Sequence, residues 1–150
     1  MTQTLRPLTP DDAEAAAALH AEGFADPWSV GSIGGLIDAG NVLALGLEED
    51  GALLAFALFQ SAAGDSELLT IATAPARRGQ GLAGRLIEAA IPALVSGGNA
   101  RLLLDVAEDN TSARRLYARL GFATDGHRPR YYTAGRAAPV DAILMSRGIG

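Results

Sequence analysis

The chain contains no cysteine and no lysine, and its two histidines, His20 and His127, lie far apart in the sequence. The missing cysteines exclude disulfide bonds, thiolate metal sites and a cysteine nucleophile. Two distant histidines offer no cluster of metal ligands, so we expect no metal. Long apolar runs are also missing, as is a basic N-terminal segment followed by an apolar run. We therefore predict a cytoplasmic protein that does not contact membranes.

What remains is the composition of a globular domain. The 150 residues are 49% hydrophobic and 19% charged, with no repeat and no long linker, which predicts a single domain over residues 1–150. Residues 1–75 hold one arginine and eleven acidic residues, a net charge of −10, whereas residues 76–150 hold eleven arginines and six acidic residues, a net charge of +5. The basic half suits a phosphorylated ligand and the acidic half a basic partner, while the net acidity argues against binding to nucleic acid.

Periodicity and turn signals predict an alternation of strands and helices. Thr9 and Pro10 mark the start of a helix, and Ser29 is placed to cap another; an Asp50-Gly51 turn indicates a hairpin, and Pro92 should kink or shorten the helix that contains it. The predicted strands cover the region near Leu5 and residues 42–47, 52–60, 67–73, 101–107, 123–132 and 140–146. The predicted helices cover residues 11–22, 29–40, 82–95 and 112–120. This order indicates a mixed α/β sheet with helices on its faces.

The most informative segment is an apolar run, residues 68–72, followed by Arg77, Arg78 and three glycines, Gly79, Gly81 and Gly84. A strand, a glycine turn and a helix start together form a phosphate-binding backbone, and the arginines add forked donors. The spacing also fits a dinucleotide fingerprint. Its position in mid-chain, after a hairpin, counts against that alternative, because the fingerprint normally opens the first βαβ unit.

A second interpretation comes from resemblance to a family. Arg78-x-x-Gly81-x-Ala83 resembles the phosphate-binding motif of the GNAT acetyltransferases, and the downstream run Asn110-x-x-Ala113-x-x-Leu116-Tyr117-x-x-x-Gly121-Phe122 resembles their next helix. The resemblance implies the GNAT fold, a mostly antiparallel sheet of about seven strands with about four helices. It also implies acetyl-CoA as the donor, bound by Ile71, Ala72, Thr73, Arg78, Gly79, Gln80, Gly81, Leu82, Ala83, Gly84 and Asn110.

The chain further resembles the RimI-type ribosomal-protein alanine N-acetyltransferases. The matching segments are Pro27-Trp28-Ser29, Leu104-Asp105-Val106, Tyr117, Tyr131-Tyr132 and Asp141-Ala142-Ile143. This resemblance implies that the acceptor is the N-terminal alanine of a small-subunit ribosomal protein, a basic N-terminus, and that Trp28, Tyr131 and Tyr132 contact it. The chain departs from the family where Asp105 replaces a glutamate and where Thr133 replaces a proline.

The chemistry is attack of an amine on a thioester, which needs an acceptor for the amine's proton and a donor for the departing thiolate. Asp105 is the expected base, through an intervening water, because an acidic group in so apolar a strand is costly without a partner or a function. Glu67 is its rival. Helical spacing alone favours Tyr117 as a core aromatic, whereas the resemblance implies that it is the general acid. With no cysteine to relay the acetyl group, direct transfer in a ternary complex is the simpler mechanism.

Other functions fit the same residues. An acetyltransferase for a free small amine or an antibiotic would keep the donor site but have a small, closed acceptor pocket. A non-catalytic acyl-CoA-binding module would not depend on Asp105 or Tyr117. A dinucleotide-binding protein would bind NAD and not CoA. We expect a monomer or a weak dimer.

Overall fold

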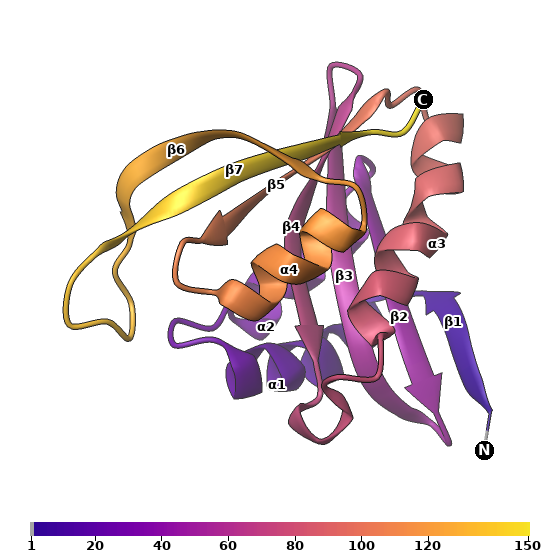
Figure 1. Cartoon of the computed structure of the whole chain (residues 1–150). Coiled ribbons are helices and arrows are strands. Elements are labelled where there is room, and N and C mark those ends of the chain that lie inside the picture. The colour runs from indigo at the N-terminus through magenta and orange to yellow at the C-terminus, as the bar shows by residue number, and fades with distance from the viewer. Residues whose placement is uncertain (1) are drawn as a thin grey trace.

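The computed structural model describes residues 2–150, in which every predicted strand and helix is present (Figure 1). The strands are β1 (Gln3–Pro7), β2 (Val42–Glu49), β3 (Ala52–Ala62), β4 (Asp65–Thr73), β5 (Arg101–Ala107), β6 (Ala123–Tyr132) and β7 (Val140–Gly148). The helices are α1 (Ala13–Gly23), α2 (Val30–Asp38), α3 (Leu82–Ser96) and α4 (Thr111–Arg119), with short 3-10 turns at Pro10–Asp12 and Pro75–Arg77.

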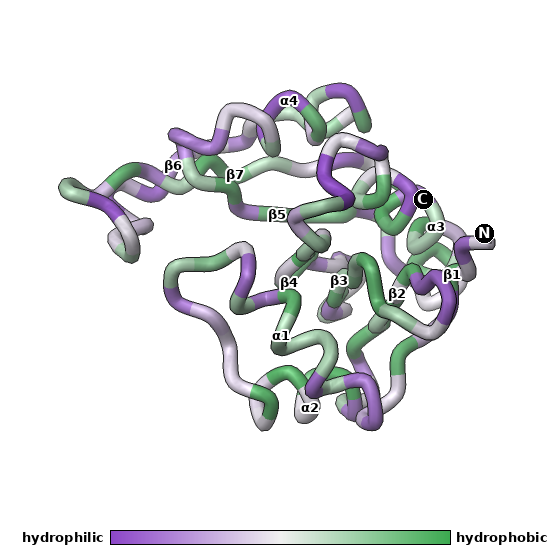
Figure 2. The backbone as a smooth tube through the Cα atoms, turned by 90° about the horizontal axis from the view of Figure 1, so that it is seen from below, coloured by the Kyte–Doolittle hydropathy of each residue, from purple (hydrophilic) through white to green (hydrophobic). Residues whose placement is uncertain are grey.

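The helices lie on both faces of one twisted sheet, whose strand order is β1-β2-β3-β4-β5-β7-β6. Figure 2 shows α1 and α2 on one face and α3 and α4 on the other. Each pair of helices covers its own apolar cluster: Leu86 and Ile87 of α3 pack with Leu102 and Leu104 on one face, and Ile33 of α2 belongs to the cluster on the other. The architecture confirms the predicted α/β mixed sheet. No helix among residues 2–150 has the length and apolar character needed to cross a bilayer.

The start of the first helix differs from the prediction. Residues 10–12 form a 3-10 turn, and the α-helix begins at Ala13 instead of Asp11. The Asp12 carboxylate accepts a hydrogen bond from the Thr9 N–H at 2.8 Å and another from the Arg6 guanidinium at 2.8 Å. These bonds hold Asp12 at the turn and tie it to β1, so the α-helix starts one residue after it.

Of the two effects expected of Pro92, a kink or a shortening, the shortening is wrong, because α3 continues to Ser96, one residue beyond the predicted end. A proline removes one backbone donor and crowds the preceding turn. Pro92 lies on the exposed side of α3, where water can satisfy the freed carbonyl, while Ala90 and Leu94 on the buried side keep their packing. Tertiary packing therefore outweighs the local preference.

The sheet divides between β4 and β5. These strands pair in parallel at Asp65–Glu67 with 101–103, and beyond that point β4 stays with β3 while β5 stays with β7. The register of β3 and β4 shifts directly after the split, leaving Leu69 as an extra residue in β4. A bulge bends its strand, and Figure 1 shows β5 leaving the direction of β4.

The pairing pattern overturns the dinucleotide-binding alternative. Within residues 2–150, the pairing between β4 and β5 is the single parallel contact in the sheet, and it spans three residues on each strand. A dinucleotide-binding domain needs a doubly wound parallel sheet. The glycine turn of this chain therefore belongs to a different architecture.

Candidate active site

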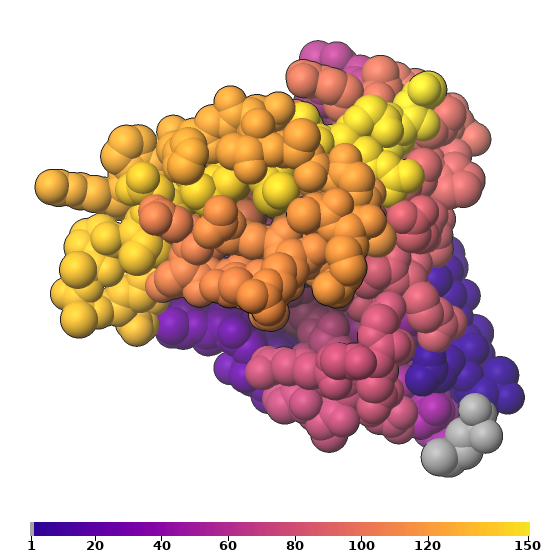
Figure 3. All heavy atoms as spheres, in the orientation of Figure 1, coloured from indigo at the N-terminus to yellow at the C-terminus, as the bar shows by residue number. Residues whose placement is uncertain are grey.

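A cleft of about 1050 Å³ opens where β4 and β5 separate. Figure 3 shows it as a hollow between the orange atoms of α4 and the rose-coloured residues before α3. Its walls are residues 68–73 of β4, residues 105–107 of β5, one side of α4, the first turn of α3 and the loop after β6. A concave site of this size between diverging elements is the expected place for a small-molecule ligand.

The N-terminus of α3 forms one end of the cleft. Gly81 is its N-cap at φ +77°, and no side chain of the described residues 2–150 caps the helix. The first helical backbone bond runs from the Arg85 N–H to the Gly81 carbonyl at 3.1 Å, so the N–H groups of residues 82–84 remain available to a ligand. Gly79, at φ +78°, makes the preceding turn. Free N–H groups at the positive end of a helix dipole fit a diphosphate.

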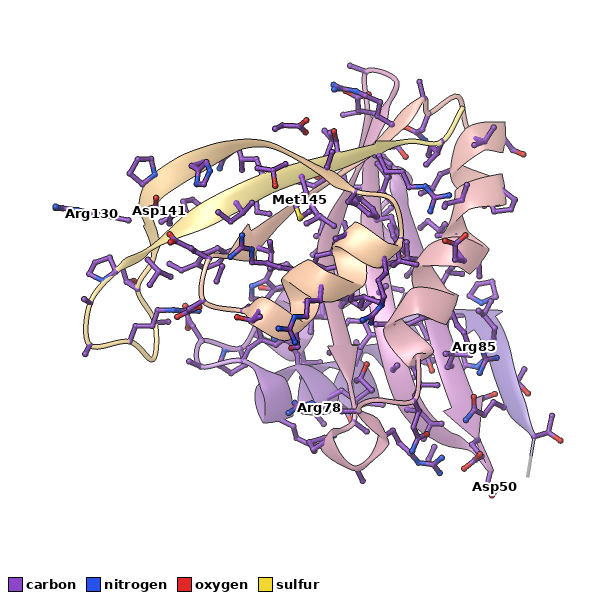
Figure 4. The ribbon with its side chains drawn as sticks, in the orientation of Figure 1. Asp50, Arg78, Arg85, Arg130, Asp141 and Met145 are labelled. Carbon is purple, nitrogen blue, oxygen red and sulfur yellow. The ribbon has the colours of Figure 1, made fainter. Side chains whose placement is uncertain are left out.

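Arginines surround this helix end. The Arg78 guanidinium lies against the end of α1, 3.2 Å from where a Cβ of Gly23 would be, and Figure 4 labels Arg78 beside the loop before α3. Arg77 also lines the cleft and is paired with the nearly buried carboxylate of Glu49. Arg119 of α4 contributes a third guanidinium to the lining. The cleft therefore presents positive charge where its backbone presents donors, as a phosphorylated ligand requires.

Tyr117 lines the middle of the cleft from α4. Its ring is 6% exposed and packs edge-on against Phe122, with 5.8 Å between ring centroids. Burial raises the pKa of Tyr117 to about 12, and the nearby Tyr132 adds to the effect. Because its hydroxyl keeps its proton at neutral pH, Tyr117 can act there as a hydrogen-bond or proton donor.

Asp105 lines the same cleft from β5, and its side chain is 24% exposed. The Arg128 guanidinium lies 3.8 Å from its carboxylate, whereas Arg101, at the start of the same strand, pairs with Asp65. Glu67 is exposed, opposite Leu103 in the paired part of the sheet and outside the cleft. Of the two carboxylates suggested by the sequence, Asp105 is therefore the one that faces the ligand space.

The residues that the sequence suggests for binding the acetyl donor lie together in the cleft, with one exception. Ile71, Ala72, Thr73, Arg78, Gly79, Gly81, Leu82, Ala83, Gly84 and Asn110 all line the cleft, and Gln80 lies outside the lining. Asn110 also caps α4, since its side-chain oxygen accepts a hydrogen bond from the Ala113 N–H at 3.3 Å. Among residues 2–150 no group of three histidine, aspartate or glutamate side chains is placed to hold a metal ion.

Of the three residues suggested for contact with the acceptor, one lines the cleft and two do not. Tyr132 lines the cleft, and its pKa is raised by burial and by the negative charge of Asp105. Tyr131 lies outside the lining and is 51% exposed, with the Arg128 guanidinium 5.3 Å from its ring centroid. Trp28 is half-buried, also outside the lining, and stacks against His20. The structure therefore brings Tyr132 alone of the three next to Asp105 and Tyr117.

Sequence reasoning missed the residues that anchor the loop after β6. The Arg136 guanidinium donates two hydrogen bonds of 2.8 Å to the Asp109 carboxylate and lies 5.6 Å from the Tyr132 ring centroid. At Gly135, a Cβ would come within 2.8 Å of the Ala25 side chain in the loop between α1 and α2. Two loops far apart in sequence thus meet at one end of the cleft, and no local pattern indicates this contact.

Comparisons with known proteins agree with this geometry. The model of the acetyltransferase (GNAT) family matches residues 11–122. The chain is 34% identical over 145 residues to the ribosomal protein bS18-alanine N-acetyltransferase of Escherichia coli (strain K12), covering 95% of each protein. It is 31% identical over 153 residues to the N-alpha-acetyltransferase RimI of Mycobacterium tuberculosis, covering 98% of this chain and 93% of that protein.

A solved structure extends the likeness to three dimensions. The crystal structure of the ribosomal-protein-S18-alanine N-acetyltransferase from Escherichia coli superposes with a TM-score of 0.92 at 32% identity, over 99% of this chain and 95% of that one. Fold and sequence therefore agree along nearly the whole chain. The chain belongs to the acetyltransferase (GNAT) family and is of the RimI type.

Proposed function

We propose that this chain transfers the acetyl group of acetyl-CoA to the N-terminal α-amine of the alanine of ribosomal protein bS18. The observation that carries the proposal is 34% identity to an enzyme named for that reaction, over 95% of both chains. The cleft supports it, since a phosphate-binding helix end, a buried tyrosine and a carboxylate line one space. A ribosomal acceptor also implies that the enzyme acts in the cytoplasm, and we expect it to work as a monomer or a weak dimer.

The donor site would be made largely of backbone. The N–H groups of residues 82–84, together with Arg78, would bind the diphosphate of CoA. After Glu67, no strand within residues 2–150 pairs with β4 on its β5 side, so backbone groups of residues 71–73 face the cleft there. They would hold the pantetheine arm, and bound acetyl-CoA supplies the thioester that the amine attacks.

The side chains in the middle of the cleft would move the protons. Asp105 would accept a proton from the acceptor ammonium through an intervening water, which makes the amine nucleophilic. Tyr117, protonated at neutral pH, would give its proton to the departing thiolate. Tyr132 would pack beside the reacting groups. Because the chain has no cysteine to carry the acetyl group, transfer would be direct and within a ternary complex.

The test of this function is an acetylation assay with a panel of peptides. Purified protein is mixed with acetyl-CoA and peptides carrying the bS18 N-terminus, the same sequence with an acetylated α-amine, or an unrelated N-terminus. The expected result is CoA release and a single acetyl mass gain on the free bS18 α-amine. Turnover of free amines or antibiotics instead would indicate a small-molecule acetyltransferase. CoA binding without turnover of any amine would indicate an acyl-CoA-binding module.

Gly81→Ala is expected to weaken acetyl-CoA binding about tenfold, because a left-handed conformation costs a residue with a Cβ about 1–2 kcal/mol. A Cβ at Gly81 would meet no atom within 4 Å, so the effect would come from the backbone at the phosphate site and not from a clash. The measurement is calorimetric titration with CoA. Gly51→Ala is the matched control. Gly51 has φ +80°, a Cβ there would also meet no atom of residues 2–150 within 4 Å, and it lies in the β2–β3 turn, outside the cleft lining. Equal CoA affinity in the two variants would contradict the assignment.

A further inference from the structure

His20 is a polar side chain that is almost fully buried beside the loop between α1 and α2. It lies in the last turn of α1 and is 1% exposed. Its Nε2 lies 3.1 Å from the Thr70 hydroxyl, and its Nδ1 accepts a hydrogen bond from the Trp28 backbone N–H at 3.1 Å. The imidazole thus joins the loop before α2 to β4, the strand that forms one wall of the cleft.

The aromatic contacts of this histidine reinforce the connection. The ring stacks on Phe24 with 4.0 Å between centroids and an interplanar angle of 6°, and on Trp28 with 5.1 Å and 27°. Phe56 of β3 lies 6.5 Å away in a tilted arrangement. Residues 24–28 therefore wrap around one imidazole, which fixes the loop by packing as well as by a hydrogen bond.

The two hydrogen bonds determine the protonation state. Nδ1 accepts an N–H and so carries no proton, which places the single proton of the neutral ring on Nε2, where it is donated to Thr70. A protonated ring would turn an N–H toward the N–H of Trp28 and lose that bond. The contacts from α1, the loop, β3 and β4 are all neutral groups, and the nearest acidic residues along the chain, Glu22 and Asp26, are exposed. Burial lowers the pKa of His20, so the neutral form prevails at neutral pH.

We propose that His20 is the positioning residue for the acceptor: as a neutral ring it holds Trp28 and its loop in the acceptor-binding position, and on protonation it releases them. The proposal rests on the proposed function, because it assumes that the loop of Trp28 contacts the acceptor. The hydrogen bonds and aromatic contacts of the ring are with Thr70, Trp28, Phe24 and Phe56, which lie outside the phosphate-binding turn at Gly79–Gly84. Because Phe24 and Thr70 also line the cleft, acceptor binding should weaken in acid more than donor binding does.

Two variants of His20 each keep one of its two hydrogen bonds and lose the other. Asparagine places an oxygen near the Nδ1 position and can keep the bond to Trp28, whereas glutamine reaches the Nε2 position and can keep the bond to Thr70. Neither side chain titrates. At neutral pH, His20→Gln should raise KM for the bS18 peptide about tenfold, because it leaves the partly buried N–H of Trp28 unpaired. His20→Asn should stay within about threefold of the wild type. In His20→Gln, KM for acetyl-CoA should change less than KM for the peptide.

The closing experiment measures KM for the peptide from pH 5 to pH 8 in the wild type and in His20→Asn, and records the fluorescence of Trp28, the single tryptophan of the chain. The peptide amine titrates equally in both reactions, so the ratio of the two KM values isolates His20. We expect this ratio to rise in acid, and wild-type Trp28 emission to titrate below pH 6.5 while that of the variant does not.

A constant KM ratio, or an emission curve that is the same in both proteins, would overturn the positioning role. If no peptide were acetylated at any pH, the proposed function would fail instead. The emission curve of the free protein would then still show whether His20 holds Trp28, so the two failures are distinguishable.

Discussion

Replacing Tyr117 by phenylalanine is expected to lower kcat about a hundredfold or more, since a positioned proton donor contributes roughly that factor to a transfer reaction. The variant loses one oxygen and keeps the ring that packs against Phe122, so the fold and the donor site should persist. The measurement is CoA release at saturating acetyl-CoA and peptide, together with KM for acetyl-CoA. A large fall in kcat with an unchanged KM for the donor would place the effect in the transition state.

The leaving group offers a control for this role. A thiolate that is intrinsically more stable needs less protonation when it departs. Tyr117→Phe should therefore lower the rate of acetyl transfer less with an acetyl thioester of a more acidic thiol than with acetyl-CoA. The pH profile gives a second check. Because burial raises the pKa of Tyr117 to about 12, the rate should not fall between about pH 8 and pH 10 through loss of this proton. An equal fall in the transfer rate with both acetyl donors would argue against general acid catalysis by Tyr117.

Much of the fold follows from local sequence signals. The sequence predicts the bounds of β5 correctly, because Leu102, Leu104 and Val106 recur at every second position and a glycine pair precedes the strand. Helix α2 starts where Ser29 accepts a hydrogen bond from the Ser32 N–H at 3.0 Å. The donor-binding half of the site can likewise be predicted from the sequence, since it is one continuous segment from β4 into α3. The sequence there encodes both the backbone shape and the charge.

The acceptor half was less predictable because its contacts join distant segments. The Arg136–Asp109 pair spans 27 residues and the His20–Thr70 bond spans 50. No periodicity or turn signal reports such pairings. Trp28 shows the consequence: its motif predicted an acceptor contact, whereas the structure places the ring against His20, outside the cleft lining. Direct contact between Trp28 and an acceptor remains a prediction.

Asp105→Asn is expected to lower kcat/KM for the peptide about a hundredfold at neutral pH, because an amide cannot accept the proton of the acceptor ammonium. The deficit should shrink as the pH rises above about 8, where an α-amine loses its proton to solvent without help. Glu67→Gln is the matched control, since it makes the same chemical change in the same sheet but outside the cleft. Steady-state rates with the bS18 peptide from pH 6 to pH 9 would give all three curves.

Asp105→Glu distinguishes a base from a structural carboxylate. The RimI-type relatives that the sequence resembles carry glutamate here, and the added methylene lengthens a side chain that lines the cleft. A base acting through water should tolerate that shift, so this variant should keep more activity than Asp105→Asn. If Asp105 served mainly to hold Arg128, which lies 3.8 Å from it, the asparagine deficit would not depend on pH. Arg128→Ala would then reproduce that deficit, and proton removal would have to be assigned to solvent or to another group in the cleft.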